Sequence, residues 1–117
     1  MSAAAPMPLR ASLQVPGDPS MLATIRAFVS RFLEPHADEE RCDDIKLAVA
    51  EACAEMRGAT TRVTLEIADD QCSILCEGVA APAAHDGGMR AELFGALAPD
   101  AVWSLDDTVR FSLPLTA

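Results

Sequence analysis

Two runs of alternating apolar and polar residues, on either side of Asp69-Asp70, most constrain the fold of this chain. In residues 62–68 the apolar side chains fall at every second position, and residues 71–76 form a returning run. A period of two is typical of a strand with one buried face, and paired acids between two such runs are a turn signal. The sequence therefore predicts an antiparallel hairpin with one apolar face.

Two stretches with helical periodicity precede this hairpin. Residues 20–33 follow Asp18, a plausible N-cap, and Pro19, which is favoured at the first helical position. Residues 38–57 form a second predicted helix that ends before Gly58. Its apolar stripe consists of Cys42, Ile45, Val49, Ala52 or Cys53, and Met56. Both helices are therefore expected to be amphipathic and to bury one side.

The remaining segments complete an α+β pattern. Residues 9–15 alternate as a first strand, residues 80–88 form a loop without periodicity, and residues 89–97 form a short third helix. Residues 101–105 and 108–115 make a last hairpin around residues 106–107. We expect a two-layer sandwich, with a mostly antiparallel or mixed sheet of about five strands covered on one face by three helices. Residues 1–8 are expected to be a flexible tail, and residues 9–117 a single domain.

The negative net charge of the chain argues against a nucleic-acid-binding function. The 117 residues carry a formal net charge of −9, whereas nucleic-acid binders usually need a basic surface. The sequence has no apolar run long enough for a membrane span and no signal peptide, so we expect a cytoplasmic protein. Six acids are concentrated between residues 34 and 44: Glu34, Asp38, Glu39, Glu40, Asp43 and Asp44. They suit either a solvated helix start or a docking patch for a basic partner.

The four cysteines do not form a metal or disulfide motif. They are Cys42, Cys53, Cys72 and Cys76, and none belongs to a C-x-x-C pair. Cys72 and Cys76 would lie about 13 Å apart on one strand, too far to pair. We expect small buried thiols in a reducing compartment.

The second predicted helix carries two carboxylates on one face. Glu51 and Glu55 are four residues apart and therefore lie one above the other. Water, a cation or a partner must offset their repulsion. The small side chains of Ala48 and Ala52 are expected to leave room for a group to approach these acids.

The order of elements and two sequence stretches resemble the bacterial anti-sigma regulatory factors. These stretches are Val49-Ala50-Glu51-Ala52-Cys53-Ala54-Glu55 and Thr108-Val109-Arg110-Phe111-Ser112-Leu113-Pro114-Leu115. The family consists of serine kinases with the histidine-kinase-like (GHKL, Bergerat) ATPase fold. The resemblance extends over residues 13–115, nearly the whole chain, and implies that fold here.

The resemblance also implies a nucleotide site, several positions of which are altered. Glu51 matches the general base, but Glu55 replaces an asparagine that holds Mg²⁺. Cys76 replaces an aspartate that accepts a hydrogen bond from adenine, with Gly78 the one glycine retained after it. Gly87 and Gly88 lie near the position of a phosphate-binding G-x-G. A thiol is a poor acceptor, so ordinary Mg-ATP binding is not expected.

These observations favour a degenerate anti-sigma-like regulator without normal ATP hydrolysis or kinase activity. It would bind a sigma factor or a STAS-type anti-anti-sigma protein through Asp38, Glu39, Glu40 and Asp43. Two alternatives stay open. One is an active serine/threonine protein kinase with a variant site, in which Glu51 is the base and Glu55 a Mg²⁺ ligand. The other is a non-catalytic docking or small-ligand-binding domain. A homodimer is implied by the resemblance alone.

Overall fold

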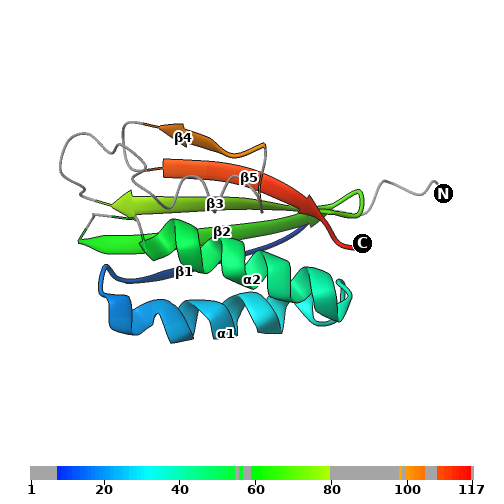
Figure 1. Ribbon diagram of the computed structural model, residues 1–117, viewed down its shortest axis with the longest axis horizontal. Helices are drawn as coiled ribbons and strands as arrows, with labels where there is room; N and C mark the ends of the chain where they lie inside the picture. Colours follow the sequence, from blue (N-terminus) through cyan, green and yellow to red (C-terminus); the bar gives the residue numbers. More distant parts are fainter. Residues whose placement is uncertain are drawn as a thin grey trace.

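The computed structural model describes residues 8–54, 56, 59–79, 98, 100–104 and 108–116, without the side chains at positions 103 and 104. Along the chain, the elements are strand β1 (Leu9–Pro16), a 3-10 turn η1 (Pro19–Met21), helices α1 (Leu22–Leu33) and α2 (Glu39–Ala54), and strands β2 (Thr60–Ala68), β3 (Gln71–Val79), β4 (Val102–Ser104) and β5 (Thr108–Pro114) (Figure 1). The described part of the chain is thus an α+β structure.

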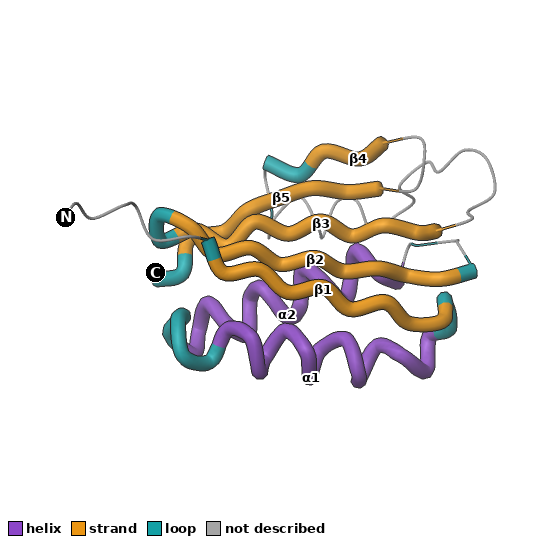
Figure 2. The backbone as a smooth tube through the Cα atoms, turned by 180° about the vertical axis from the view of Figure 1, so that it is seen from behind, coloured by secondary structure: helices purple, strands orange, loops and turns teal. Residues whose placement is uncertain are grey.

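The strands form one antiparallel sheet with both helices on the same face. The strand order is β1-β2-β3-β5-β4, and each neighbouring pair is antiparallel. Helix α1 lies along β1, and α2 packs against α1, β3 and β5 (Figures 1 and 2). The predicted α+β architecture with helices covering one face is confirmed. The sheet is antiparallel throughout its described pairs, rather than mixed.

Strand register explains why one face is apolar. Val63 of β2 lies opposite Leu13 of β1 and Cys76 of β3, and Cys76 lies opposite Val109 of β5. Such rows of buried side chains face the helices and join the core with Ile25, Leu33, Ile45 and Val49. Because successive strand residues point to opposite faces, the alternate positions form a polar open face on the other side of the sheet.

The central hairpin confirms the sequence prediction and extends it. Asp69 and Asp70 have φ angles of 53° and 61°, in the left-handed region that a two-residue hairpin turn requires. Aspartate tolerates this region better than most residues other than glycine. Strand β3 continues to Val79, three residues beyond the predicted end, because Glu77–Val79 pair with Thr60–Arg62 of β2.

Side-chain caps set the starts of the helical segments. The Ser20 amide donates to Asp18 Oδ1 at 2.9 Å, and Pro19 opens the 3-10 turn that leads into α1. The Arg41 amide donates to Asp38 Oδ1 at 2.8 Å, which caps α2. Helix α1 begins at Leu22, slightly later than predicted, because η1 takes the first turn. The predicted end of the second helix at Arg57 lies outside the described residues.

One prediction about α2 is wrong. Ala48 and Ala52 were expected to leave room beside the two glutamates, but both are 0% exposed and belong to the core. The helix is packed against α1 on one side and against β3 and β5 on another, so it buries a wider face than a single stripe. The two alanines therefore lie within the packed core and leave no access for a ligand.

Several sequence predictions lie outside the described residues. These are the tail as far as residue 7, the loop at 80–88, the third helix at 89–97 and the turn at 106–107. Within the described part, no helix is long and apolar enough to cross a membrane.

Candidate functional site

The position expected to recognise adenine is turned into the core. Cys76 lies in the middle of β3, is 0% exposed and faces the helices. Its thiol shares a hydrogen bond with the thiol of Cys53 on α2, and this bond, together with burial, raises the pKa of Cys76 well above its ordinary value. Cys76 is therefore a neutral, buried thiol whose hydrogen-bond partner is Cys53. It does not fit the role of a carboxylate acceptor for an adenine amino group.

The remaining nucleotide-site predictions are only partly described. Gly78 is buried in β3, opposite Thr61 of β2. Glu51 is partly exposed on α2, two residues before Cys53. Glu55, Gly87 and Gly88 lie outside the described residues. The described positions are thus distributed over α2 and β3, and two of the three, Cys76 and Gly78, are buried.

A small cleft lies beside these residues, between the start of α1 and the end of α2. Its volume is about 210 Å³. Its described lining comprises Pro16, Gly17, Asp18, Pro19, Leu22, Ile25, Cys53, Ala54, Met56 and Thr61. Ligand pockets usually measure about 300–1,000 Å³. The cleft reaches Cys53, whereas Glu51 and Cys76 are not part of this lining.

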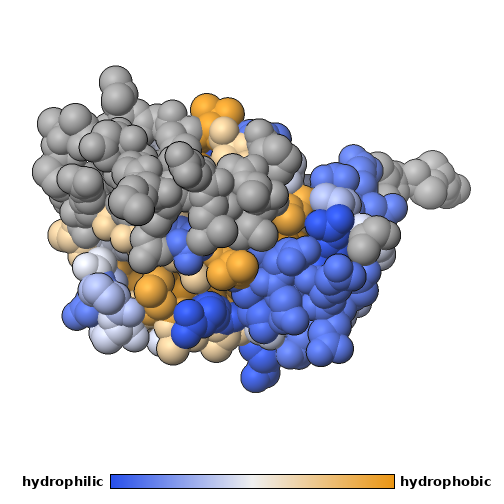
Figure 3. All heavy atoms as spheres, viewed as in Figure 1, coloured by the Kyte–Doolittle hydropathy of each residue, from blue (hydrophilic) through white to orange (hydrophobic). Residues whose placement is uncertain are grey.

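The second candidate site is the end of the molecule where α1 stops and α2 begins. We call it the acidic end and define it as Glu34, Asp38, Glu39, Glu40, Asp43 and Asp44. All six are exposed except Asp44, which is half-buried. Hydrophilic residues gather over this end in Figure 3. The four predicted partner-binding residues are therefore brought together on one accessible surface.

The carboxylates of the acidic end differ in the groups that they contact. Asp38 serves α2 as its cap, and Lys46 Nζ lies 3.3 Å from Asp43 Oδ1. Glu39 and Glu40 occupy the first turn of α2, where negative charge is stabilised by the helix dipole. A cleft of about 350 Å³ adjoins them, lined by Ser30, Glu34, Ala37, Glu39, Cys42, Asp43 and Lys46. Its mixture of three carboxylates and one ammonium would attract a basic group.

An apolar residue that the sequence pattern did not single out lies next to this surface. Leu47 is 45% exposed and lies one turn after Asp43 on the same side of α2. Leu47 lies outside the apolar stripe of the predicted helix. An apolar residue at such a position was the sequence signal that could have identified it as exposed. An exposed leucine next to acids offers a protein partner an apolar contact bordered by charge.

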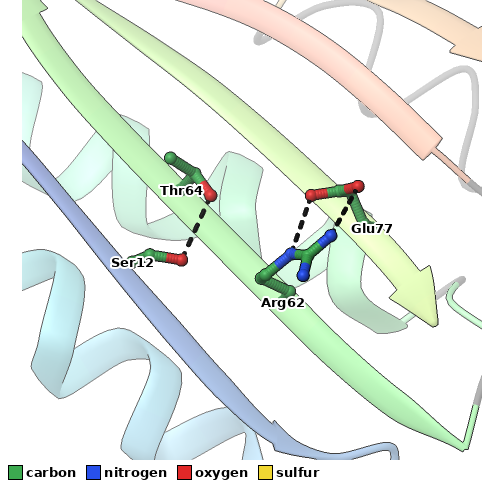
Figure 4. A network of polar contacts seen from close by, with 4 residues as sticks. All are labelled: Ser12, Arg62, Thr64 and Glu77. Atoms are coloured by element: carbon green, nitrogen blue, oxygen red, sulfur yellow. Dashed lines mark hydrogen bonds and ion pairs between the residues drawn. The ribbon is translucent and has the colours of Figure 1, made fainter.

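The open face of the sheet carries polar contacts that were also missed. Arg62 Nε and Nη2 donate to the two carboxylate oxygens of Glu77 at 3.0 and 3.1 Å, and Ser12 shares a hydrogen bond with Thr64 (Figure 4). Asp100 accepts hydrogen bonds from the Ser112 amide and hydroxyl. The Arg62–Glu77 pair follows from the register of a hairpin that turns at residues 69–70, so the sequence contained this information.

Metal binding has no support among the described residues. No group of three or more His, Cys, Asp or Glu in that part of the chain is placed to hold a metal ion.

A comparison of the sequence with models of protein families finds no match, and a comparison with curated proteins finds none either.

Proposed function

We propose that this chain is a cytoplasmic, non-catalytic regulator of the anti-sigma type, built on a Bergerat-like fold. It binds a sigma factor or a STAS-type anti-anti-sigma protein through the acidic end. The observation that carries the proposal is the accessible cluster of Glu39, Glu40 and Asp43 beside the exposed side chain of Leu47. The carboxylates supply attraction to a basic partner, and Leu47 supplies an apolar contact.

The state of Cys76 supports the non-catalytic part of the proposal. A hydrogen bond that involves a charged group contributes about 1.5–3 kcal/mol, which corresponds to roughly ten- to hundredfold in affinity. Cys76 is uncharged, buried and already hydrogen-bonded to Cys53. An adenine ring would have to disrupt the contact between α2 and β3 to reach it. Normal nucleotide binding at this position would therefore carry an additional energetic cost.

Partner binding is tested with purified sigma factors and STAS proteins of the same organism, by calorimetry at low and high salt. We expect binding that weakens with salt and falls at least tenfold in the double variant Glu39→Gln/Glu40→Gln and in Leu47→Ala. Glu66→Gln, on the open sheet face, is the matched control for loss of charge. Asp38→Asn removes a charge but keeps the α2 cap, because asparagine is an equally good N-cap.

Nucleotide binding is tested separately by titrating the full chain with Mg-ATP and Mg-ADP. We expect neither binding heat nor thermal stabilisation. Saturable micromolar binding that is lost in Glu51→Ala would overturn the non-catalytic proposal in favour of a variant serine kinase.

The partner experiment has its own contradicting outcome. Equal binding of the sigma factor or STAS protein by wild type and Leu47→Ala would remove the proposed partner surface, and a small-ligand-binding domain would become the better hypothesis.

A further inference from the structure

Strand β1 is a long, regular edge of the sheet. It pairs with β2 on one side, and no described segment of the chain pairs with its other side (Figures 1 and 2). The strand has eight residues, and its register with β2 runs from Leu9 to Pro16 without a bulge. An edge of this kind presents a row of backbone N–H and C=O groups to which another strand can add.

One hydrogen bond shows which backbone groups of β1 point outward. The Gly17 amide donates to the Ala59 carbonyl at 2.9 Å, and these two residues continue the register of β1 with β2. Hydrogen-bonded pairs recur at every second position of an antiparallel ladder, so the odd-numbered residues of β1 bond to β2. The amides and carbonyls of the even-numbered residues Arg10, Ser12 and Gln14 therefore point away from the sheet.

The end of the strand is closed to further pairing, but its middle is not. Pro16 has no amide hydrogen, and its carbonyl accepts a hydrogen bond from the Asp18 amide at 2.8 Å. The rest of the strand carries one charged side chain, that of Arg10. Edge strands are commonly protected from pairing by charges, prolines or a bulge. Residues 10–14 of β1 therefore have little protection against the addition of a strand.

The helix-facing side chains of β1 are incompletely covered. Val15 is buried in the core, and Leu13 packs against the core but is only half-buried. Leu9, on the same face of the strand, is 47% exposed. A strand added at this edge would remove apolar surface of Leu9 and Leu13 from water, which favours the addition.

We propose that this edge is a self-association surface, at which β1 of a second copy of the chain pairs antiparallel about a two-fold axis at Ser12. Ser12 then lies opposite Ser12 of the second copy, and Arg10 lies opposite Gln14. The outward amides and carbonyls of these residues are all hydrogen-bonded in both copies. The two sheets become one continuous sheet, with the helices of both copies on the same face.

The side chains of β1 are complementary to themselves in this arrangement. On the open face, the guanidinium of Arg10 lies beside the side-chain amide of Gln14, whose oxygen accepts hydrogen bonds. On the helix-facing side, Ala11 lies opposite Leu13, so that a small apolar residue meets a larger one. No charge is placed directly opposite a like charge, which would be destabilising across a strand pair. A second copy therefore fits this edge in both charge and shape.

Two prolines select the register. Pro8 and Pro16 flank the outward amides, and with the axis at Ser12 they lie opposite each other, so neither takes the place of a donor. An axis one residue earlier would place Pro8 opposite Gln14, and an axis one residue later would place Pro16 opposite Arg10. Each shift would leave a carbonyl of the central strand pair without its donor. An axis two residues earlier would place Arg10 opposite itself.

Sedimentation equilibrium of the full-length protein over a range of micromolar concentrations tests the pairing. We expect a reversible equilibrium between monomer and dimer. Ser12→Pro removes an outward amide without removing a bond to β2. It should raise the dimer dissociation constant at least about tenfold, because a hydrogen bond is lost from each copy. Ser12→Ala keeps the amide and is the matched control, which should dimerise as the wild type does.

A cysteine at the axis tests the register without a proline. Directly opposed Cα atoms in a hydrogen-bonded pair lie about 5.5 Å apart, which a disulfide can span. Ser12→Cys should therefore form a disulfide-linked dimer under mild oxidation. The wild type, whose four cysteines are buried, should not. Arg10→Cys should stay unlinked, because the two copies of position 10 are about 13 Å apart along the strands in this register.

Several outcomes would overturn the proposal. These are a protein that stays monomeric at every concentration, a dimer that Ser12→Pro and Ser12→Ala weaken equally, or a disulfide through Arg10→Cys but not Ser12→Cys. Circular dichroism checks that each variant is folded, and the cysteine variants decide the question even if Ser12→Pro does not fold. No residue of β1 belongs to the acidic end, so the result is independent of whether a sigma factor or STAS protein binds there.

Discussion

At the scale of single residues, buried thiols make the stability of this fold depend on pH in the alkaline range. Burial raises the pKa of Cys72 to about 12 from an ordinary 9.0, against a smaller lowering by a hydrogen bond with the backbone of Glu66. An unfolded chain ionises this thiol near pH 9, whereas the folded chain keeps the proton. The stabilising contribution is therefore complete below pH 9 and is lost as the pH rises towards 12. The chain has no tyrosine, so fewer other groups obscure this range.

We predict that Cys72→Ala weakens the dependence of stability on alkaline pH. Each pH unit over which only the unfolded thiol ionises costs about 1.4 kcal/mol. Urea unfolding between pH 8 and pH 11 should show a shallower decline in the variant than in wild type, although the variant is less stable at pH 8 because of the cavity. Leu113→Ala, which opens a cavity opposite Cys72 without removing an ionisable group, is the control, and an equal change of slope in both variants would contradict the prediction.

At the scale of elements, the local sequence pattern was sufficient to predict the strands but not how α2 packs against the sheet. The period-two alternation located β2, and the Asp69-Asp70 turn fixed its register with β3. The extension of β3 through Gly78 was missed because a glycine in a strand resembles the start of a loop. The contact of Cys53 with Cys76 could not be predicted, because it depends on how α2 is rotated against the sheet.

The packing of α2 gives a second prediction. Ala52 is 0% exposed in the core, so Ala52→Leu should destabilise the protein by about 1–3 kcal/mol through overpacking. Ala54 is exposed near the end of the same helix, and Ala54→Leu makes the same chemical change without a core to disturb. Denaturant unfolding of both variants measures the difference. Equal stability of the two would mean that the side of α2 at Ala52 has room for a ligand, as the sequence had suggested.

At the scale of the whole molecule, charge is distributed unevenly over the two layers. The open face of the sheet balances Arg10, Arg62 and Arg110 against Glu66, Glu77 and Asp100. Six of the 18 acids of the chain are instead gathered at the acidic end, where the two helices meet. The sequence located this cluster of acids, and the fold adds the exposed Leu47 and the cleft beside them. The proposed partner binding thus rests on the helical layer, while the sheet provides the support.

Repulsion at the acidic end gives the last prediction. Glu34 follows the last residue of α1 as its C-cap, where a negative charge opposes the helix dipole, and it shares a cleft with Glu39 and Asp43. Glu34→Gln should therefore stabilise the protein by a few tenths of a kcal/mol or more at low ionic strength. The amide oxygen can still accept the hydrogen bond that the Ser30 hydroxyl donates to Glu34 at 3.4 Å.

Salt distinguishes this electrostatic effect from a change in packing. The Debye length falls from about 30 Å at 0.01 M to about 3 Å at 1 M, so the gain from Glu34→Gln should shrink as sodium chloride is added. Glu66→Gln, on the charge-balanced face of the sheet, should show no comparable gain at low salt. Thermal unfolding of the three proteins across this range measures both effects. A gain for Glu34→Gln that does not change with salt would show that repulsion at the acidic end is not its cause, and the charge argument for a basic partner at this surface would lose its support.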